Sequence, residues 1–312
     1  MTRFLVTGAS GLLGLNFALK YYRQHSLTGI VHRNPLQNAP FRVVQADLAQ
    51  PDRLDEMLDQ VQPEVVLHCA AMANIDACEK QPERTWQINT LAPERLAKRA
   101  ARDGFRLVHI STDAVFDGSR GNYSEGDQPN PLGVYARSKL AAEEKVLAAC
   151  PQTLVARVNF YGWSLYGRRS LAEHFHRSFS ENRPARGFTD VYFCPLEVTQ
   201  LAETLLRLIE LRSSGIYHVV SQEGLSKYEF GCKLARVFGF DERLLQPVRL
   251  QEAGLIARRS PDLRLRTEKL ALALGQPAPG VAEGLQRFCR QEQAGAAREI
   301  RALAAVSQEI DQ

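Results

Sequence analysis

Residues 4–14 have the sequence FLVTGASGLLG. The apolar run at residues 4–6 predicts a short buried strand, and the apolar pattern of residues 12–23 predicts a helix. Between them, glycines follow the spacing Gly-x-x-Gly-x-x-Gly, and a turn this tight requires residues without a Cβ atom. Because a helix N-terminus presents unpaired N–H groups to a phosphate, the stretch predicts a turn that binds the pyrophosphate of a dinucleotide.

Strand and helix patterns alternate along the rest of the first half of the chain. Further strands are predicted at residues 29–32, 41–44, 65–68, 106–110 and 154–158, and further helices at residues 52–60, 82–103 and 138–149. This alternation is typical of an α/β fold with a Rossmann-type doubly wound parallel sheet.

The pattern becomes less regular after about residue 160, which indicates a smaller C-terminal substrate lobe interleaved with late elements of the sheet. We therefore expect an NAD(P)-binding Rossmann domain at residues 1–160 and the substrate lobe at residues 161–290. Residues 291–312 are expected to form a helical tail, which is either solvated or part of an oligomer contact.

Composition limits the class of protein. The 312 residues carry a net charge of +4 with dispersed lysine and arginine, which argues against nucleic acid or an anionic membrane as a partner. No apolar stretch is long enough to span a bilayer and the N-terminus lacks the layout of a signal peptide, so we expect a cytoplasmic protein. The 6 cysteines form no Cys-x-x-Cys pair, which predicts reduced thiols and no metal site.

Tyr135 and Lys139 lie four residues apart at the start of a predicted helix, so their side chains share one helix face. An ammonium beside a phenol lowers the tyrosine pKa, which predicts that Tyr135 exchanges a proton with a carbonyl or carbinol oxygen. Ser111 and Thr112 follow a predicted strand, and their hydroxyls can bind the same oxygen. Tyr-x-x-x-Lys alone is often an exposed helix pair, but its combination with these hydroxyls and the glycine turn favours a nicotinamide-dependent enzyme.

His32 and Arg33 follow the second predicted strand, where enzymes that use NAD carry an acidic residue for the adenosine 2′-hydroxyl. An arginine there can instead bind a 2′-phosphate, so the sequence favours NADP (NADPH) as the cofactor. A solvated surface arginine is the alternative interpretation, under which NAD stays open. His68 and His109 lie within predicted strands and are expected to be core residues rather than catalysts.

The sequence resembles the extended short-chain dehydrogenase/reductase family, and within it the branch of the dTDP-4-dehydrorhamnose reductases. The segments that carry the resemblance are TGASGLLG at residues 7–14, PEVVLHCAA at 63–71, ISTDAVFDG at 110–118, YSE at 123–125, Pro131, VYARSKL at 134–140 and GIYH at 215–218. The resemblance extends to about residue 290, and the segment at 110–118 is its most specific part. It implies an NADPH-dependent reductase of a keto group on a nucleotide-linked deoxysugar.

The resemblance also implies roles for individual residues. Thr112, Tyr135 and Lys139 would form the catalytic triad, and Lys139 would also bind the nicotinamide ribose. The residues expected at the cofactor are Gly8, Ser10, Gly11, Leu12 and Leu13 at the pyrophosphate, Asp47 and Leu48 at the adenine, Cys69, Ala70 and Ala71 at the ribose, and His32, Arg33, Asn89, Ser111, Tyr135, Lys139 and Val158. Asn89 matches a position that braces the active site. The residues expected on the substrate side are Asn74, Val115, Asn159 and Arg259.

One departure from this branch falls in the substrate region. The branch usually carries a tryptophan directly after the sixth strand, whereas this chain has Asn159 there and its tryptophan at Trp163. The asparagine is similar to that of sugar-nucleotide epimerases and dehydratases, so an enzyme of that class with bound NAD stays open. Such dehydratases usually place an acid–base pair after the Ser/Thr position, whereas here Asp113 is followed by Ala114.

A regulatory protein is the third interpretation. The regulatory beta subunit of methionine adenosyltransferase resembles the same branch and binds NADP, which leaves a non-catalytic role with a catalytic partner subunit open. The expected small-molecule partner is a nucleotide sugar, and a homodimer also stays open.

Overall fold

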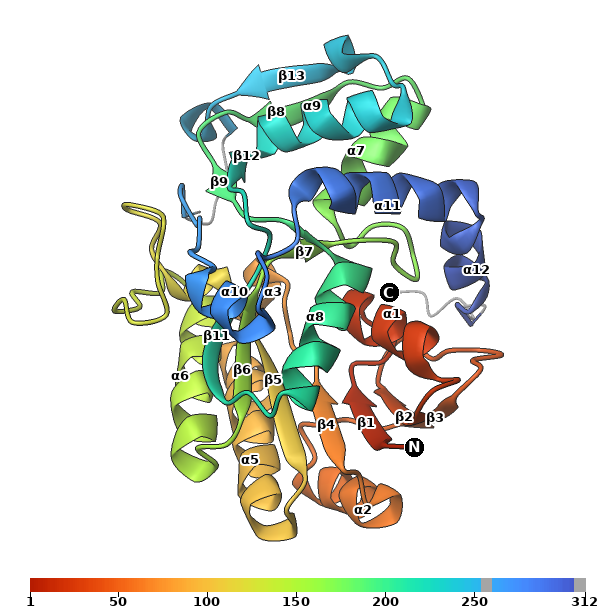
Figure 1. Cartoon of the computed structure of the whole chain (residues 1–312), viewed down its shortest axis with the longest axis vertical. Helices are drawn as coiled ribbons and strands as arrows, with labels where there is room; N and C mark the ends of the chain where they lie inside the picture. The colour runs from red at the N-terminus through yellow and green to blue at the C-terminus, as the bar shows by residue number, and fades with distance from the viewer. Residues whose placement is uncertain (254–259, 306–312) are drawn as a thin grey trace.

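The computed structural model describes residues 1–253 and 260–305. Its centre is a seven-stranded sheet in the order β11-β6-β5-β4-β1-β2-β3, in which every neighbouring pair is parallel (Figure 1). The strands are β1 (Arg3–Thr7), β2 (Ser26–Val31), β3 (Arg42–Gln45), β4 (Val65–His68), β5 (Arg106–Thr112), β6 (Leu154–Val158) and β11 (Gly215–Val219). The predicted α/β fold with a doubly wound parallel sheet is confirmed.

Helices cover both faces of this sheet. One face packs against α1 (Leu12–Tyr21), α8 (Val198–Glu210) and α10 (Glu268–Leu274), and the other against α2 (Pro51–Val61), α5 (Ala92–Asp103) and α6 (Val134–Ala149). Along β1, Phe4 and Val6 contact the first group of helices and Leu5 contacts the second, as the two-residue period of a strand requires. Burial on both faces explains why these strands are almost continuously apolar.

The expected helix at residues 82–103 is three segments. α4 (Pro82–Trp86) is followed by the π-helical turn η1 (Gln87–Leu91), in which the Ala92 N–H donates to the Gln87 carbonyl oxygen, and then by α5. Pro93 has no N–H to donate to the carbonyl of Asn89, so the regular α-helical ladder cannot continue through this point. The extra residue in the turn directs the Asn89 side chain into the interior, where it is 1% exposed.

The substrate lobe lies above the carboxyl ends of the strands and is built from separate stretches of chain (Figure 1). Its short strands pair as β7 (Phe160–Tyr161) with β10 (Leu196–Glu197), β8 (Ala185–Phe188) with β13 (Leu245–Val248), and β9 (Tyr192–Phe193) with β12 (Leu225–Ser226). Its helices include α7 (Leu171–Ser180), α9 (Lys227–Phe238), α11 (Val281–Gln293) and α12 (Ala296–Ala302). Since α8 and β11 return to the central sheet between these stretches, the lobe is interleaved with the sheet. The domain boundaries expected at residues 160 and 290 stay a prediction.

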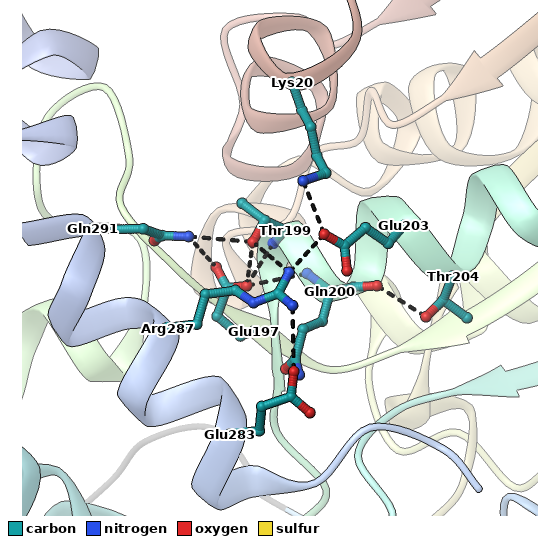
Figure 2. Close-up of polar contacts among 9 residues, drawn as sticks. All are labelled: Lys20, Glu197, Thr199, Gln200, Glu203, Thr204, Glu283, Arg287 and Gln291. Atoms are coloured by element: carbon teal, nitrogen blue, oxygen red, sulfur yellow. Dashed lines mark hydrogen bonds and ion pairs between the residues drawn. The ribbon is translucent and has the colours of Figure 1, made fainter. Parts of the chain in front are cut away.

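A polar network ties α11 to the helices of the central sheet (Figure 2). Arg287 on α11 donates to Glu203 on α8 at 2.6 Å, and Lys20 on α1 contacts the same carboxylate at 2.8 Å. Glu197 caps the N-terminus of α8 by accepting from the Thr199 and Gln200 N–H groups, each at 3.0 Å. The lobe and the sheet are therefore linked by side-chain contacts as well as by the chain itself.

The described part of the expected helical tail, residues 291–305, is not a single solvated helix. α11 ends at Gln293 and α12 follows as a separate helix, in which Ala297 is 6% and Ile300 is 5% exposed. These side chains pack into the apolar cluster of the substrate lobe, so this helix is held by tertiary contacts. Residues 306–312 lie outside the described part of the chain. Among the described residues, no helix combines the length and apolar character that crossing a membrane requires.

Candidate active site

The glycine turn between β1 and α1 approaches the end of β4 very closely. Gly8 has a φ of +68°, and a Cβ atom there would lie 2.8 Å from the Ala70 nitrogen. A Cβ atom on Gly14 would lie 2.4 Å from the Gly8 carbonyl oxygen. Glycine is therefore required at both positions, at Gly8 by conformation and space and at Gly14 by space alone.

The first turn of α1 has no side-chain cap. Gly11 is its N-cap residue, and no side chain of residues 1–253 or 260–305 caps the helix by accepting a hydrogen bond from its first N–H groups. Ser10, Gly11 and Leu12 are partly exposed, whereas Leu13 is buried at 2% exposure. A glycine cradle beside free N–H groups fits the pyrophosphate of a dinucleotide cofactor.

The residues expected around the adenosine lie at the ends of β2 and β3. Arg33 is exposed, and the imidazole of His32 lies 3.6 Å from the Asp47 carboxylate. Arg84 on α4 donates to the same carboxylate at 3.0 Å. Burial opposes the ionisation of Asp47, but the Ala49 N–H, Arg84 and His32 outweigh it and lower its pKa. The Leu48 side chain is 8% exposed.

Thr112, Tyr135 and Lys139 come together at the carboxyl end of β5. Thr112 is the last residue of β5 and is 7% exposed, and Tyr135 lies in the first turn of α6. Lys139, one turn later on α6, is 2% exposed and donates to the Ile110 carbonyl oxygen at 2.7 Å. The end of β4, which continues into Cys69, Ala70 and Ala71, lies beside this group, because β4 and β5 are neighbours in the sheet.

The expectation that Lys139 lowers the pKa of Tyr135 is wrong for this structure. Burial raises the pKa of Tyr135 to about 12; a hydrogen bond with Thr112 opposes this rise, and the charge of Asp113 adds to it. Burial also lowers the pKa of Lys139 to about 8, against the effect of Glu143. The Lys139 ammonium contacts groups of β5, so desolvation dominates over a Tyr135–Lys139 interaction.

Asn89 joins the segment after β4 to α6. Its Oδ1 accepts from the Met72 N–H at 2.8 Å, and its Nδ2 donates to the Met72 carbonyl at 3.0 Å and to Ser138 Oγ at 3.1 Å. Ser138 lies directly before Lys139, so the Asn89 side chain ties α6 to the segment that follows β4. Val158 is 5% exposed at the end of β6 and lies opposite Thr112 in the register of β5 and β6.

The buried Ser111 hydroxyl makes a hydrogen bond within the core. It donates to Glu143 at 2.5 Å, and Arg157 on β6 donates to the same carboxylate at 2.7 Å. Glu143 and Arg157 are each 1% exposed, so this ion pair lies entirely within the core. This pair, which joins α6 to β6, was not predicted from the sequence.

On the substrate side, Asn159 donates to the Asp113 carboxylate at 2.6 Å, and the Thr112 hydroxyl donates to the other carboxylate oxygen at 3.1 Å. Asp113 is 4% exposed, and burial raises its pKa to about 6, which Asn159, Thr112 and Lys227 oppose. The sequence alone assigned no role to Asp113 and did not indicate that Lys227 lies close enough to affect it. Asp113 and Asn159 are 46 positions apart in the chain, so only the folded structure brings them together and makes Asp113 a candidate site residue.

The remaining substrate-side expectations have mixed outcomes. Asn74 is exposed and caps α3 (Ile75–Lys80) by accepting from the Ala77 N–H at 2.9 Å. Val115 is 0% exposed and packs against Phe116, so its side chain has no free surface for a ligand in this structure. Arg259 lies outside the described residues.

The Asp113→Asn variant is expected to be more stable than the wild type above pH 6. The folded pKa of about 6 lies above the usual 3.8, so the wild type loses stability as the pH rises from about 4 through 6. A pKa shift of about two units corresponds to about 3 kcal/mol of stability. The variant should therefore be more stable than the wild type by about this amount at pH 8, and the difference should vanish below pH 4. Urea denaturation at several pH values measures it. An equal difference between the two proteins at pH 4 and pH 8 would contradict this expectation.

The chain matches the family described as the RmlD substrate binding domain over residues 2–294. It is 33% identical to the probable low-salt glycan biosynthesis reductase Agl14 of Haloferax volcanii over 252 residues, which cover 77% of this chain and 82% of that protein. It is also 32% identical to methionine adenosyltransferase 2 subunit beta of Danio rerio over 286 residues, 86% of this chain and 84% of that protein.

Solved structures agree with this match. The dTDP-4-dehydrorhamnose reductase of Bacillus anthracis, solved in complex with NADP, superposes with a TM-score of 0.81 at 25% identity and covers 93% of this chain and 99% of its own. A hypothetical dTDP-4-dehydrorhamnose reductase from Sulfolobus tokodaii gives a TM-score of 0.79 at 29% identity, covering 90% of this chain and 98% of its own.

Proposed function

The chain belongs to the RmlD substrate binding domain family, and from this premise we propose that it is an NADPH-dependent reductase of a keto group on a nucleotide-linked deoxysugar. The observation that carries the proposal is the convergence of Thr112, Tyr135 and Lys139 at the carboxyl end of β5, on the same edge of the sheet as the glycine turn and separated from it by β4. Ligands of doubly wound sheets bind at this edge. The reductase names of the Haloferax volcanii and Bacillus anthracis relatives support an oxidoreductase.

Each residue has a distinct task in this proposal. Bound NADPH supplies the hydride that the carbonyl carbon receives. The raised pKa of about 12 keeps Tyr135 protonated at neutral pH, so its phenol can donate a proton to the carbonyl oxygen. Thr112 orients that oxygen by donating its hydroxyl proton to it in place of the Asp113 carboxylate, which accepts that proton in this structure. Lys139 holds the nicotinamide ribose with its ammonium. Asn159 and Arg259 are assigned to the substrate side.

The experiment that tests the proposal follows NADPH oxidation against a panel of nucleotide-linked 4-keto sugars. We expect turnover with at least one of them and none with the corresponding 4-hydroxy sugars in the same direction. Failure with every keto sugar, in protein that binds NADPH, would overturn the proposal.

Binding of NADPH is expected to depend on Arg33, which is exposed after β2 and is the residue we assign to the adenosine 2′-phosphate. Replacing Arg33 by alanine removes one charged contact, so NADPH affinity should fall by about 1.5–3 kcal/mol. Fluorescence titration of both reduced cofactors measures this. NADH affinity serves as the control and should not change in the variant. If the wild type bound NADH more tightly than NADPH, the expected preference for NADPH would be wrong.

A regulatory role is the second candidate, favoured by the match to the beta subunit of methionine adenosyltransferase 2 over 84% of that protein. Under this alternative the chain binds the cofactor and a catalytic partner subunit instead of turning over a sugar. Co-purification with such a subunit and an effect on its activity would favour it. An epimerase or dehydratase with bound NAD has less support, because Ala114 occupies the second position of the expected acid–base pair.

A further inference from the structure

Lys139 is held by β5. Its ammonium donates to the Ile110 carbonyl oxygen at 2.7 Å, and its Nζ lies 3.2 Å from Nε2 of His109. Lys139 is 2% exposed and His109 is 0% exposed, so water does not compete for these contacts. An ammonium has three protons; two are directed to β5, and the third is left for a group in the active site.

The contact with Lys139 determines which nitrogen of His109 carries the proton. Burial, followed by the charges of Lys139 and His68, lowers the pKa of His109 well below its usual value, so the ring is neutral. Because a charged ammonium donates hydrogen bonds and accepts none, Nε2 of His109 must be the bare nitrogen. The proton of the ring is therefore on Nδ1.

That Nδ1 proton has no acceptor among the residues that the structure describes. The ring of His68 stacks on His109 with centroids 5.5 Å apart, and Nε2 of His68 also lacks a partner within the described chain. An aliphatic side chain would fill position 109 without burying an unsatisfied polar atom, which is costly in a core. Packing alone therefore does not explain an imidazole at position 109, whereas the hydrogen bond with Lys139 does.

His68 extends the arrangement to the glycine turn. Its Nδ1 lies 2.7 Å from the Thr7 hydroxyl oxygen, which also accepts from the Ala70 N–H at 3.2 Å. Thr7 directly precedes Gly8, so the stacked imidazoles lie between the catalytic lysine and the expected pyrophosphate turn.

We propose that His109 is a positioning residue, whose Nε2 accepts a hydrogen bond from the Lys139 ammonium and thereby fixes its direction within the active site. The sequence suggested only a core histidine here. His109 touches neither substrate nor cofactor and acts through Lys139. The use of the third ammonium proton on the cofactor ribose rests on the proposed reductase function, whereas the contact itself does not.

The groups that face Lys139 are Glu143 on its own helix, His109 on β5, and His68 and Cys69 at the end of β4. Burial lowers the pKa of His68 to about 3 and raises that of Cys69, so neither titrates between pH 6 and pH 9. A titration of Lys139 in this range therefore reports on the ammonium itself.

The test measures the Lys139 pKa by NMR in full-length protein labelled with ¹³C at the lysine ε-carbon, with the signal assigned from Lys139→Met. We expect the wild type to titrate near pH 8. His109→Phe keeps an aromatic ring but removes the acceptor, so the pKa should fall further, by about one unit. His109→Gln restores an acceptor and should bring the pKa back.

Val108→Ala is the matched control, because Val108 is a buried β5 residue next to His109 and the substitution weakens the core without removing an acceptor. It should leave the Lys139 pKa unchanged. An unchanged pKa in His109→Phe, or an equal shift in Val108→Ala, would overturn the proposal.

The wild-type protein provides a second measurement that needs no variant at position 109. Its ¹⁵N imidazole shifts should show a bare Nε2 and a protonated Nδ1 for His109, and the opposite tautomer would refute the proposal. Both measurements are independent of turnover. A wild type that reduces no keto sugar but shows the expected pKa shift and tautomer contradicts the proposed function and leaves the role of His109 intact.

Discussion

Tyr135→Phe is expected to reduce turnover of a keto sugar by a factor on the order of 10²–10⁴, the usual effect of removing a positioned general acid. The substitution deletes only the hydroxyl of a side chain that is already partly buried at the start of α6, so the fold should persist. NADPH affinity should also persist, because most of the expected cofactor contacts lie elsewhere, at the glycine turn, at the ends of β2, β3 and β4 and on Lys139, and phenylalanine keeps the aromatic ring at position 135. Steady-state kinetics and a fluorescence titration measure both quantities.

Tyr166→Phe is the control for this substitution, since Tyr166 is 37% exposed on the loop before α7 and is not among the residues assigned to the site. It should leave turnover unchanged. The regulatory alternative predicts a different pattern: the wild type reduces no sugar, and Tyr135→Phe affects a partner enzyme as strongly as the wild type does. Observing that pattern would make the tyrosine a structural residue.

Arg157→Met is expected to lower the free energy of unfolding by about 3–5 kcal/mol, because it leaves the carboxylate of Glu143 buried without its ion-pair partner. Arg157 and Glu143 are each 1% exposed, and the guanidinium donates to both carboxylate oxygens. Urea denaturation measures the loss. Stability should return in part when Glu143→Gln is added, because the double variant no longer buries an unpaired charge.

An exposed ion pair provides the comparison. Arg236 donates to Glu242 at 2.7 Å, but their side chains are 66% and 39% exposed. Arg236→Met should therefore change stability very little, since solvent screens such pairs. If Arg157→Met were equally mild, the Arg157–Glu143 pair would not be the internal support of β5 and β6 that its burial indicates.

Local sequence patterns predict the central sheet well because the inner strands, such as β4 and β6, are buried on both faces and their neighbours are parallel. The apolar runs at β1, β4 and β6 leave little choice of secondary structure, and the glycine spacing fixes the turn. The break of the helix at residues 87–91 was not predicted. Its cause, the missing N–H of Pro93, is visible in the sequence, but the response of the backbone depends on packing.

The electrostatics of the site depend on contacts that no local pattern contains. The pKa of Tyr135 rises because of burial, although its spacing from Lys139 suggested a fall. Asp113 meets Asn159 across 46 positions of chain, and Arg84 meets Asp47 across 37. Desolvation is a property of the folded surroundings, so residue spacing identifies the participants of a site better than their ionisation.

The position of β11 at the edge of the sheet affects how the protein is made. A ribosome delivers β6 before the first part of the substrate lobe and delivers β11 only afterwards. At synthesis rates of about 5–20 residues per second, the nascent chain carries β6 as an open edge for roughly 3–12 seconds. Unpaired strand edges recruit other chains, so premature release before residue 215 would produce a fragment prone to aggregation and dependent on chaperones.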